Sequence, residues 1–531
     1  MESQESLTNS IEQTSAETLG VTATVHKAGP RHLRLGPVAG AYEKLVPALV
    51  EKGGRLGSLV ATDERARSGD FRLRAVVLFD KAGWAVEVEQ QLPATAPVLQ
   101  SIASRVPAAH WQEREAAEMM GFTLVNHPEP ARRLLHEHTP ADSPRLRKDF
   151  DGSLRPPFVA GPSPSFRPVR GEGVHEIPVG PIHAGIIEPG HFRFSVLGER
   201  ILHLQIRLGY QHKGTEKLFE GQTPAMGVYL AERISGDTTF GHALAYCLAL
   251  ERLCGTPVPT RAVHLRALAL ELERLANHVG DLGGLCADIG HLFGASHFGR
   301  LRGEFLNKCE LLSGNRYLRG YCCPGGVRGE LEPSMAKELI GWLPRVRADF
   351  TEVCETVLEA DSVAARMEEV GLLGEQAVRD LGIVGPAARA SGVGLDVRQD
   401  FADGPWGELG FEPVVETRGD VLARARLRYR EATQALDLVE VMLTFLPGGA
   451  ILHPLGRPRP FELGIGQVEG WRGEILTCVM TDDEGLLWRV RARDPSVQNW
   501  LGLALAVEMN LVSDFPLCNK SFNLSYSGSD L

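Results

Sequence analysis

Residues 71–90 show the alternation of apolar and polar side chains that is typical of β-strands. The segment 71–79 (FRLRAVVLF) is rich in β-forming residues, and the segment 84–90 (WAVEVEQ) alternates again with its apolar side chains on one face. The tripeptide 81–83 (KAG) separates them and suits a tight turn. The pattern therefore predicts a β-hairpin here, followed by a short helix over 97–104 that starts at a proline.

From residue 222 onward the apolar positions recur every three to four residues, which predicts helices. Over residues 265–282 they form one apolar stripe, and charged residues share another face. The pattern alone leaves open whether the charged face meets solvent or forms a buried polar network. A further helix is predicted over 333–370. The stripe consists of Leu265, Leu268, Leu272, Leu275, Val279 and Leu282, and the charged face of Glu271, Arg274, His278 and Asp281.

Composition divides the chain into four segments. Residues 1–22 are rich in Glu, Ser, Thr and Gln and have no apolar core, which predicts a disordered leader. Residues 151–176 are rich in proline, which predicts a linker. Two folded domains are therefore expected, over 23–150 and 177–531. The linker prolines are Pro156, Pro157, Pro162, Pro164 and Pro168.

The totals describe an ordinary globular protein, with 43% hydrophobic and 23% charged residues. The net charge of -11 argues against nucleic acid as a partner. No two of the nine cysteines have CxxC spacing, which argues against a local zinc or iron–sulfur site and favours buried thiols in a reducing compartment. The longest apolar runs, 500–512 and 436–446, are shorter than the ~18–20 residues of a membrane span and contain charges.

The segment 230–251 (LAERISGDTTFGHALAYCLALE) carries the strongest functional signal. Gly236 and Asp237 interrupt the chain before a helix that Thr238 or Thr239 can cap. The segment resembles a metal motif of nickel–iron hydrogenase large subunits, Arg-Ile-Cys-Gly-x-Cys-x-x-x-His. Arg233, Ile234, Gly236 and His242 are retained, whereas Ser235 and Thr238 stand at the two cysteine places.

The second cysteine pair of that family belongs near the C-terminus, in Asp-Pro-Cys-x-x-Cys. This chain ends NKSFNLSYSGSDL, so that Asn523 and Leu524 take the first two places and Ser525 and Gly528 the cysteine places. A nickel–iron site needs four soft thiolates, and none of the four positions supplies one. We therefore expect no metal bound by this chain, and active nickel–iron hydrogenase chemistry is the least favoured function.

The quinone-site subunits of respiratory complex I share this frame and the loss of its cysteines. In addition, residues 110–150 resemble the small α/β subunit that lies beside the quinone-site subunit. The two units are fused here, as in the large subunits of formate hydrogenlyase and hydrogenase-4. The resemblance implies an α+β fold, with a small N-terminal α/β domain fused to a largely helical hydrogenase large-subunit-like domain with peripheral β-hairpins. The N-terminal matches are Trp111, Glu113, Arg114, Glu115, Glu118 and Gly121.

In complex I a histidine on the first hairpin loop and a tyrosine on a following helix bind the two oxygens of the quinone head group. The resemblance implies His183, His191 and Asp288 as the candidate quinone and proton site, because a histidine can supply a proton near neutral pH. The tyrosine position is Pro224, which has no hydroxyl. Glu232, Arg233 and His242 are expected to line what remains of the metal cavity.

The resemblance implies a peripheral redox subunit of a membrane-bound complex I-like or hydrogenase-related complex. Such a subunit passes electrons between a partner iron–sulfur subunit, which carries a [4Fe-4S] cluster, and a quinone or other small acceptor, coupled to ion translocation. Antiporter-like integral membrane subunits would hold it on the cytoplasmic side of the inner membrane.

A non-catalytic scaffold with a collapsed cavity is the alternative function. An open channel to His191 favours the redox subunit, and a packed core there favours the scaffold. NAD binding is implied by the family's dehydrogenase names alone. Gly464-x-Gly466 is the nearest sequence to a nucleotide loop, but it lacks the strand–turn–helix context of one.

Overall fold

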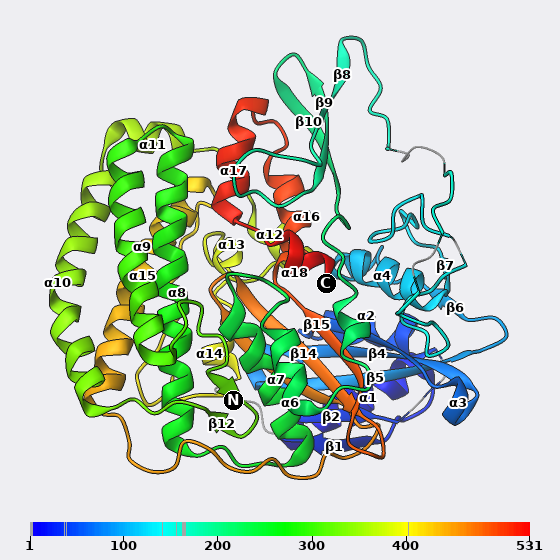
Figure 1. Ribbon diagram of the computed structural model, residues 1–531. Coiled ribbons are helices and arrows are strands. Elements are labelled where there is room, and N and C mark those ends of the chain that lie inside the picture. Colours follow the sequence, from blue (N-terminus) through cyan, green and yellow to red (C-terminus); the bar gives the residue numbers. More distant parts are fainter. Residues whose placement is uncertain are drawn as a thin grey trace.

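The computed structural model describes residues 4–36, 38, 40–140, 142–154, 157–161, 166–401 and 403–531. A small domain built around one sheet, formed by the N-terminal residues, packs beside a larger part that combines long helices with smaller sheets (Figure 1). Helices and strands are thus segregated rather than alternating, which confirms the predicted α+β fold class.

A five-stranded sheet with the order β1-β2-β5-β4-β3 forms the centre of the N-terminal domain. The predicted hairpin is confirmed, because Phe79 of β4 pairs with Trp84 of β5 across the turn. The strands are β1 (Val25–Gly29), β2 (His32–Leu35), β3 (Arg55–Asp63), β4 (Asp70–Phe79) and β5 (Trp84–Pro93). The helices beside them are η1 (Ala41–Leu45), α2 (Val46–Glu51), α3 (Arg65–Ser68), η2 (Asp80–Ala82), η3 (Pro107–Ala109) and α4 (His110–Met120).

Two predictions for the N-terminal domain are wrong. The leader is not disordered over 4–19, because these residues form helix α1 (Gln4–Leu19), in which Leu7 and Ile11 are each 1% exposed and join the domain core. Apolar residues one helical turn apart give this polar segment a face to bury. The helix expected over 97–104 is replaced by strand β6 (Val98–Gln100), which pairs in parallel with β7 (Thr123–Val125).

The connection between the domains is irregular. Its described residues between β7 and β8 (Val174–Val179) form no helix or strand. The predicted linker over 151–176 falls in this stretch, although its Pro156, Pro162 and Pro164 lie outside the described residues. The two domains also pack directly on each other. Apolar side chains of β3 and β4 share a buried cluster with those of the C-terminal sheet, and Arg55 pairs with Glu474 at 2.8 Å.

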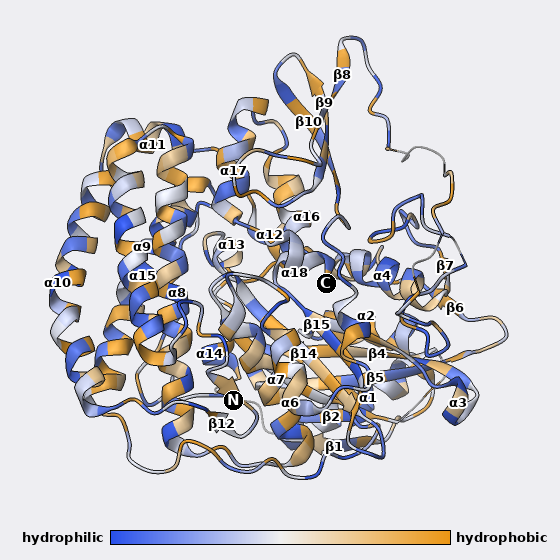
Figure 2. Cartoon of the chain, in the orientation of Figure 1, coloured by the Kyte–Doolittle hydropathy of each residue, from blue (hydrophilic) through white to orange (hydrophobic). Residues whose placement is uncertain are grey.

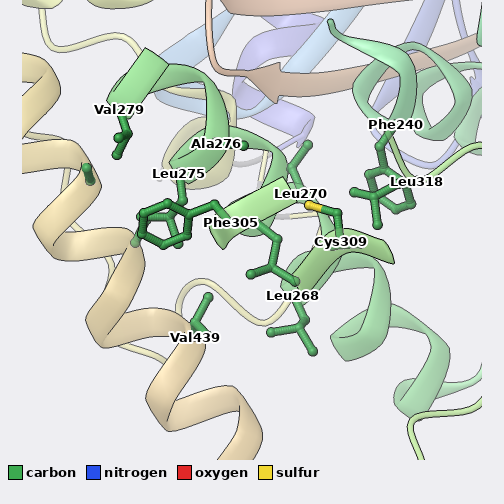
Figure 3. Close-up of a cluster of buried hydrophobic side chains, with 14 of the residues drawn as sticks. Phe240, Leu268, Leu270, Leu275, Ala276, Val279, Phe305, Cys309, Leu318 and Val439 are labelled. Atoms are coloured by element: carbon green, nitrogen blue, oxygen red, sulfur yellow. The ribbon is translucent and has the colours of Figure 1, made fainter. Parts of the chain in front are cut away.

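Four long helices pack side by side to form the helical part (Figure 1). Leu275, Phe305 and Val439, from three of them, lie in one buried apolar cluster (Figure 3). The predicted stripe of leucines on α8 is buried in this cluster. These helices are α8 (Thr260–Asp288), α9 (Leu292–Ser313), α10 (Pro333–Leu358) and α15 (Val421–Thr444).

The helix predicted over 333–370 is interrupted. Helix α10 ends at Leu358, Ala360 is extended, and α11 (Asp361–Met367) follows. Asp361 stands in the first turn of α11, where a carboxylate interacts favourably with the helix dipole. No helix among the described residues is long and apolar enough to cross a membrane, and hydrophilic residues recur along the outer helix α10 (Figure 2).

Helix α7 (Thr239–Cys254) lies against β13 (Gly464–Gly470), the edge strand of a sheet with β14 (Gly473–Thr481) and β15 (Leu487–Arg493). A Cβ atom at Gly466 would lie 2.0 Å from the carbonyl oxygen of Ala245, so glycine is required for this close approach. The Gly464-x-Gly466 pattern therefore serves helix–strand packing. All nine cysteines are free, and eight of them are buried as predicted.

A second three-stranded sheet projects from the molecule at the top of Figure 1. It consists of β8, β9 (His191–Leu197) and β10 (Arg200–Arg207), with the order β10-β9-β8. The remaining elements are α5 (Thr215–Leu218), α6 (Pro224–Ala231), β11 (Cys322–Cys323), β12 (Gly326–Val327), α12 (Glu375–Leu381), α13 (Pro386–Arg389), α14 (Val397–Asp400), α16 (Ser496–Ala506), η4 (Val512–Asp514), α17 (Phe515–Phe522) and α18 (Tyr526–Asp530).

Candidate functional site

The four positions that correspond to hydrogenase cysteines come together in the structure, and we call them the remnant site: Ser235, Thr238, Ser525 and Gly528. Ser235 and Thr238 precede helix α7, whereas Ser525 caps the N-terminus of α18 by accepting a hydrogen bond from the amide of Gly528. The hydroxyl oxygens of Ser235 and Ser525 lie 2.9 Å apart, although 290 residues separate them. Both serines are buried, with 1% and 4% of their surface exposed.

Asp237 and Arg472 organise one side of the remnant site. The Asp237 carboxylate accepts hydrogen bonds from Ser235 at 3.0 Å and Thr238 at 3.2 Å. Arg472 donates to both carboxylate oxygens, at 2.6 and 2.7 Å, and to the hydroxyl of Thr238. Although burial acts in the opposite direction, the guanidinium lowers the pKa of Asp237 to about 2. The hydroxyls that replace cysteines here are held by a fixed ion pair.

His242 and Asp494 fill the other side. Nε2 of His242 lies 2.9 Å from a carboxylate oxygen of Asp494, and neither side chain is exposed. Asp494 also accepts the amide hydrogen of Ser496 at the start of α16. Burial opposes ionisation of Asp494, but the hydrogen bond with His242 outweighs it and lowers its pKa. A Cβ atom at Gly528 would lie 2.5 Å from this carboxylate, so a cysteine does not fit there without movement.

The donor atoms of the remnant site do not suit nickel or iron. Two serine hydroxyls, one threonine hydroxyl and a glycine replace the thiolates that such metals require. The described residues also contain no group of three His, Cys, Asp or Glu side chains arranged to hold a metal ion. Cys518 is buried in α17, where its sulfur lies against Gly371 and Arg424.

Lys213 brings a second cation to this region, and sequence reasoning missed it. Its ammonium group donates to the carbonyl oxygens of Arg233 and Ile234, at 2.9 and 3.2 Å, and to the hydroxyl of Ser527. Burial lowers the pKa of Lys213, while the charges of Glu188, Asp530 and Asp494 oppose this shift. Its partners are two backbone carbonyls and one hydroxyl, so no motif in the sequence marks Lys213.

The three residues expected to line a remnant cavity, Glu232, Arg233 and His242, contact different parts of the structure. His242 faces Asp494, as described above. Glu232 is buried and accepts the amide hydrogen of Gly320 at 2.6 Å, and burial raises its pKa. Arg233 is exposed and donates to the carbonyl oxygen of Tyr229. The structure therefore brings only His242 into contact with the remnant site.

His183 and His191 close the base of an exposed loop, which we call the histidine loop (residues 180–191). Nε2 of His183 bonds the carbonyl oxygen of Gly190 at 2.8 Å, and Nδ1 of His191 bonds that of Gly180 at 3.3 Å. Burial lowers the pKa of His191. Within the loop, Ile182 is 87% and Ile186 is 95% exposed.

The histidine loop is attached to the remnant site through Glu188. Its carboxylate accepts the amide hydrogens of Tyr526 and Ser527, at 3.2 and 3.1 Å, immediately after Ser525. The Tyr526 ring is 5% exposed and would be 2.5 Å from a Cβ atom at Gly190. A phenol therefore lies beside the loop, although it comes from the C-terminal segment.

Asp288 and Pro224 do not complete a two-point quinone clamp in this conformation. The side chain of Asp288 is exposed at the end of α8 and forms no hydrogen bond or ion pair with another described residue. Partial desolvation of the carboxyl raises the pKa of Asp288, and the charge of Lys520 opposes this shift. Pro224 begins helix α6, and its carbonyl oxygen accepts a hydrogen bond from Tyr246 at 2.9 Å.

The charged face of α8 forms a buried polar network, which is one of the two alternatives that the sequence pattern left open. Glu271, Arg274, His278 and Asp281 are at most 3% exposed. His278 bonds Glu431 at 2.8 Å, and Arg428 bonds Asp281 at 2.8 Å. The amide of Asn523, at the place of the motif aspartate, also donates to Asp281, so this network reaches the remnant site.

Comparison with known proteins gives matches along most of the chain. Residues 40–155 match the family model of the respiratory-chain NADH dehydrogenase 30 Kd subunit, and residues 288–458 match that of the 49 Kd subunit. Formate hydrogenlyase subunit 5 of Escherichia coli (strain K12) is 33% identical over 91% of this chain and 87% of its own length. Hydrogenase-4 component G of the same strain is 33% identical over 90% of this chain and 84% of its own.

A solved structure supports the same relationship. One chain of the membrane-bound sulfane sulfur reductase, an archaeal respiratory membrane complex, superposes with a TM-score of 0.64 and 25% sequence identity. The match covers 68% of this chain and 99% of that chain. Together with the family models, it confirms the resemblance of both domains to complex I-like and hydrogenase-related subunits.

Proposed function

The chain belongs to the family of fused large subunits that includes formate hydrogenlyase subunit 5 and hydrogenase-4 component G, and we propose that it is the peripheral redox subunit of a membrane-bound complex I-like or hydrogenase-related complex. In this role it passes electrons between a partner iron–sulfur subunit and a quinone or other small acceptor, coupled to ion translocation. The observation that carries this proposal is the contrast between a filled remnant site and an adjoining exposed loop with two histidines.

The proposed partners are an iron–sulfur small subunit that carries a [4Fe-4S] cluster and antiporter-like integral membrane subunits. These partners would hold the chain on the cytoplasmic side of the inner membrane. The histidine loop offers a surface for such contacts, because Ile182, Ile186 and Ile187 are 87%, 95% and 51% exposed. Exposed apolar residues grouped in one loop are typical of protein or membrane contact sites.

His191 is the group best placed for proton transfer to an acceptor. Because its Nδ1 faces the carbonyl oxygen of Gly180, Nδ1 carries the hydrogen of the neutral ring and Nε2 carries the lone pair. Nε2 is buried and has no hydrogen-bond partner among the described residues, so the loop has to open before an acceptor can reach it. The lowered pKa of His191 means that a proton taken up at Nε2 is readily given to a reduced quinone oxygen.

A non-catalytic scaffold is the second candidate function, and the burial of Nε2 of His191 favours it. Both histidines bond backbone carbonyls at the base of the loop, which is a structural role. The remnant site is packed, as a scaffold would require. Active nickel–iron hydrogenase chemistry is the third candidate. The donor atoms described above argue against it, and stoichiometric nickel in the purified protein would support it.

Electron paramagnetic resonance of the partner's cluster in the purified complex distinguishes the first two functions. The signal is recorded while a short-chain quinone analogue is titrated, in wild type, in His191→Ala and in the control His175→Ala on the exposed strand β8. The redox proposal predicts a quinone-dependent change that His191→Ala abolishes and His175→Ala retains. No response to quinone in an assembled complex would support the scaffold.

A further inference from the structure

The burial of Nε2 of His191 has a cause outside the histidine loop. In strand β9 the alternate residues Phe192 and Phe194 are 1% and 0% exposed and lie in a buried apolar cluster. Since successive side chains of a strand point to opposite faces of the sheet, His191 and Arg193 belong to the other face. In an antiparallel sheet that packs on a core with one face, the other face meets solvent unless another segment covers it.

The connection between the two domains supplies this cover. The ring of Phe166, in the segment predicted as a linker, lies 5.3 Å from the imidazole of His191, measured between ring centroids. The guanidinium of Arg193 lies 4.5 Å from the centroid of the same Phe166 ring. One aromatic side chain from the linker therefore packs against both of these residues of β9.

Gln205 fastens this part of the linker to the sheet. Its amide oxygen accepts the amide hydrogen of Arg167 at 2.6 Å, and its amide nitrogen donates to the carbonyl oxygen of Arg167 at 2.9 Å. Gln205 stands directly opposite Arg193 on the neighbouring strand β10, so both side chains lie on the same face. The two hydrogen bonds hold the backbone next to Phe166 against the face that carries His191.

This attachment can open without unfolding a domain. Phe166 is only partly buried, and both hydrogen bonds between Gln205 and Arg167 are exposed to solvent. Segments held by few buried contacts and by exposed hydrogen bonds open locally at low free-energy cost. Phe192 and Phe194, on the opposite face of the same strand, are fixed in the core instead.

We propose that Phe166 is a lid that controls the access of small acceptors to His191. This inference rests on the proposed function, in which His191 gives a proton to an acceptor. In the closed state the phenyl ring packs against the imidazole. An acceptor reaches Nε2 only after residues 166–167 and the histidine loop have moved aside.

Modification of the full chain by diethyl pyrocarbonate, followed by peptide mass spectrometry, measures the access to each histidine. The reagent acylates an unprotonated imidazole nitrogen, and burial lowers the pKa of His191, so this ring is neutral at neutral pH. His191 should react about tenfold faster in Phe166→Ala than in wild type, because the covering ring and its contact with Arg193 are lost. Gln205→Ala should accelerate the reaction by about threefold to tenfold, because it removes both hydrogen bonds to Arg167.

Three controls separate a lid from a general loss of structure. Phe158→Ala is the matched control, because Phe158 is another linker aromatic and stacks on His138 with 4.4 Å between ring centroids. It should leave the rate at His191 unchanged. His175, exposed on β8, is the internal reference, and its rate should be the same in every variant. Phe166→Tyr retains the ring and should restore the protection of His191.

Reoxidation of the partner's cluster by a short-chain quinone in the purified complex separates the lid from the redox proposal. If both are correct, reoxidation is faster in Phe166→Ala than in wild type. Faster modification of His191 in Phe166→Ala, with no reoxidation by quinone in either form, would contradict the redox function and still support the lid. The lid is overturned by an unchanged rate at His191 in both Phe166→Ala and Gln205→Ala, or by faster modification with an unchanged rate of reoxidation.

Discussion

The remnant site and the histidine loop lie next to each other but differ in their exposure to solvent. In the remnant site Ser235, Ser525 and His242 are at most 4% exposed; the two hydroxyls bond each other and Nε2 of His242 bonds Asp494, whereas Nδ1 of His242 has no partner among the described residues. In the histidine loop, Ile186 is 95% exposed, and Nε2 of His191 is likewise buried without a partner among the described residues.

This difference shows what becomes of a metal position when its ligands are lost. A buried polar group without a partner costs about 1–3 kcal/mol, so an emptied ligand set is stable only when its groups bond one another. Ser235 and Ser525 do so directly, and Asp237 with Arg472 completes the set. The loop depends less on internal partners, because residues 184–187 are exposed to solvent, although Nε2 of His191 is buried. We therefore propose that the remnant site is structural and that any chemistry belongs to the loop.

Removing one carboxylate from the remnant site should produce the largest difference between the regions. Asp494→Ala leaves His242 and the amide of Ser496 without their buried acceptor, and we expect the free energy of unfolding to fall by about 3–5 kcal/mol. Asp288→Ala removes the same charge at an exposed position and should change stability by less than about 0.5 kcal/mol. Urea denaturation measures both, and equal losses would contradict the comparison.

A new covalent bond tests whether the two motifs still meet. The hydroxyls of Ser235 and Ser525 are in contact, so the double variant S235C/S525C should form a disulfide under mild oxidation. We expect the oxidised form to be about 2–4 kcal/mol more stable than the reduced form, because the bridge restrains a long loop in the unfolded chain. Non-reducing peptide mapping identifies the bond. Failure to form it in the folded protein would place the two serines apart.

The pH dependence of stability should report on the first turn of α7. Glu273 accepts the amide hydrogens of Phe240 and Gly241, and burial raises its pKa to about 8. A folded pKa above the unfolded value means that the folded state binds the proton more tightly, so stability falls as pH rises from about 4.5 to about 8.

Each pKa unit corresponds to about 1.4 kcal/mol, so Glu273 should contribute a fall of up to about 5 kcal/mol over this range. Thermal unfolding at a series of pH values should show this fall in wild type and a flatter profile in Glu273→Gln. An unchanged profile would show that Glu273 is ionised in the folded protein.

Glycine substitution tests how tightly the remnant site is filled. A Cβ at Gly528 would meet Asp494 at 2.5 Å, so Gly528→Ala should destabilise the protein by about 1–3 kcal/mol. At Gly236, in the other motif, a Cβ would have no heavy atom within 4 Å, and Gly236→Ala is the matched control. Equal melting temperatures for the two variants would indicate spare volume beside Asp494.

The smallest effect is expected in the histidine loop. His183→Ala removes one partly exposed hydrogen bond to Gly190 and should cost about 0.5–1.5 kcal/mol. Differential scanning calorimetry should therefore show a small shift of the melting temperature. A loss of stability as large as that caused by Asp494→Ala would show that the loop contributes as much to folding stability as the remnant site does.

Much of this arrangement could be predicted from the sequence. The first motif retains Arg233, Ile234, Gly236 and His242, and the structure brings the replaced ligands of the two motifs within contact distance. The apolar stripe of α8 could be predicted because helical periodicity is a local property of the chain. The burial of the charged face could not, since it depends on partners such as Glu431 and Arg428, which lie about 150 residues away.

Other features depend on contacts between distant residues, which local sequence patterns do not reveal. Lys213 and Arg472 stabilise the remnant site through backbone carbonyls and a distant carboxylate, so neither belongs to a recognisable motif. Helix α1 has a polar composition. Its helical structure depends on Leu7 and Ile11 packing against the core of the N-terminal domain, and the sequence of the helix does not reveal this contact.

The most direct test of the central claim is the rate at which a short-chain quinone reoxidises the reduced cluster of the partner subunit in the purified complex. We would compare wild type, His191→Ala in the histidine loop and Ser235→Ala in the remnant site. The account predicts a reoxidation rate at least tenfold lower in His191→Ala, as for loss of a proton donor, and a rate near wild type in Ser235→Ala. Slow reoxidation in Ser235→Ala with a normal rate in His191→Ala would contradict it and return the chemistry to the remnant site.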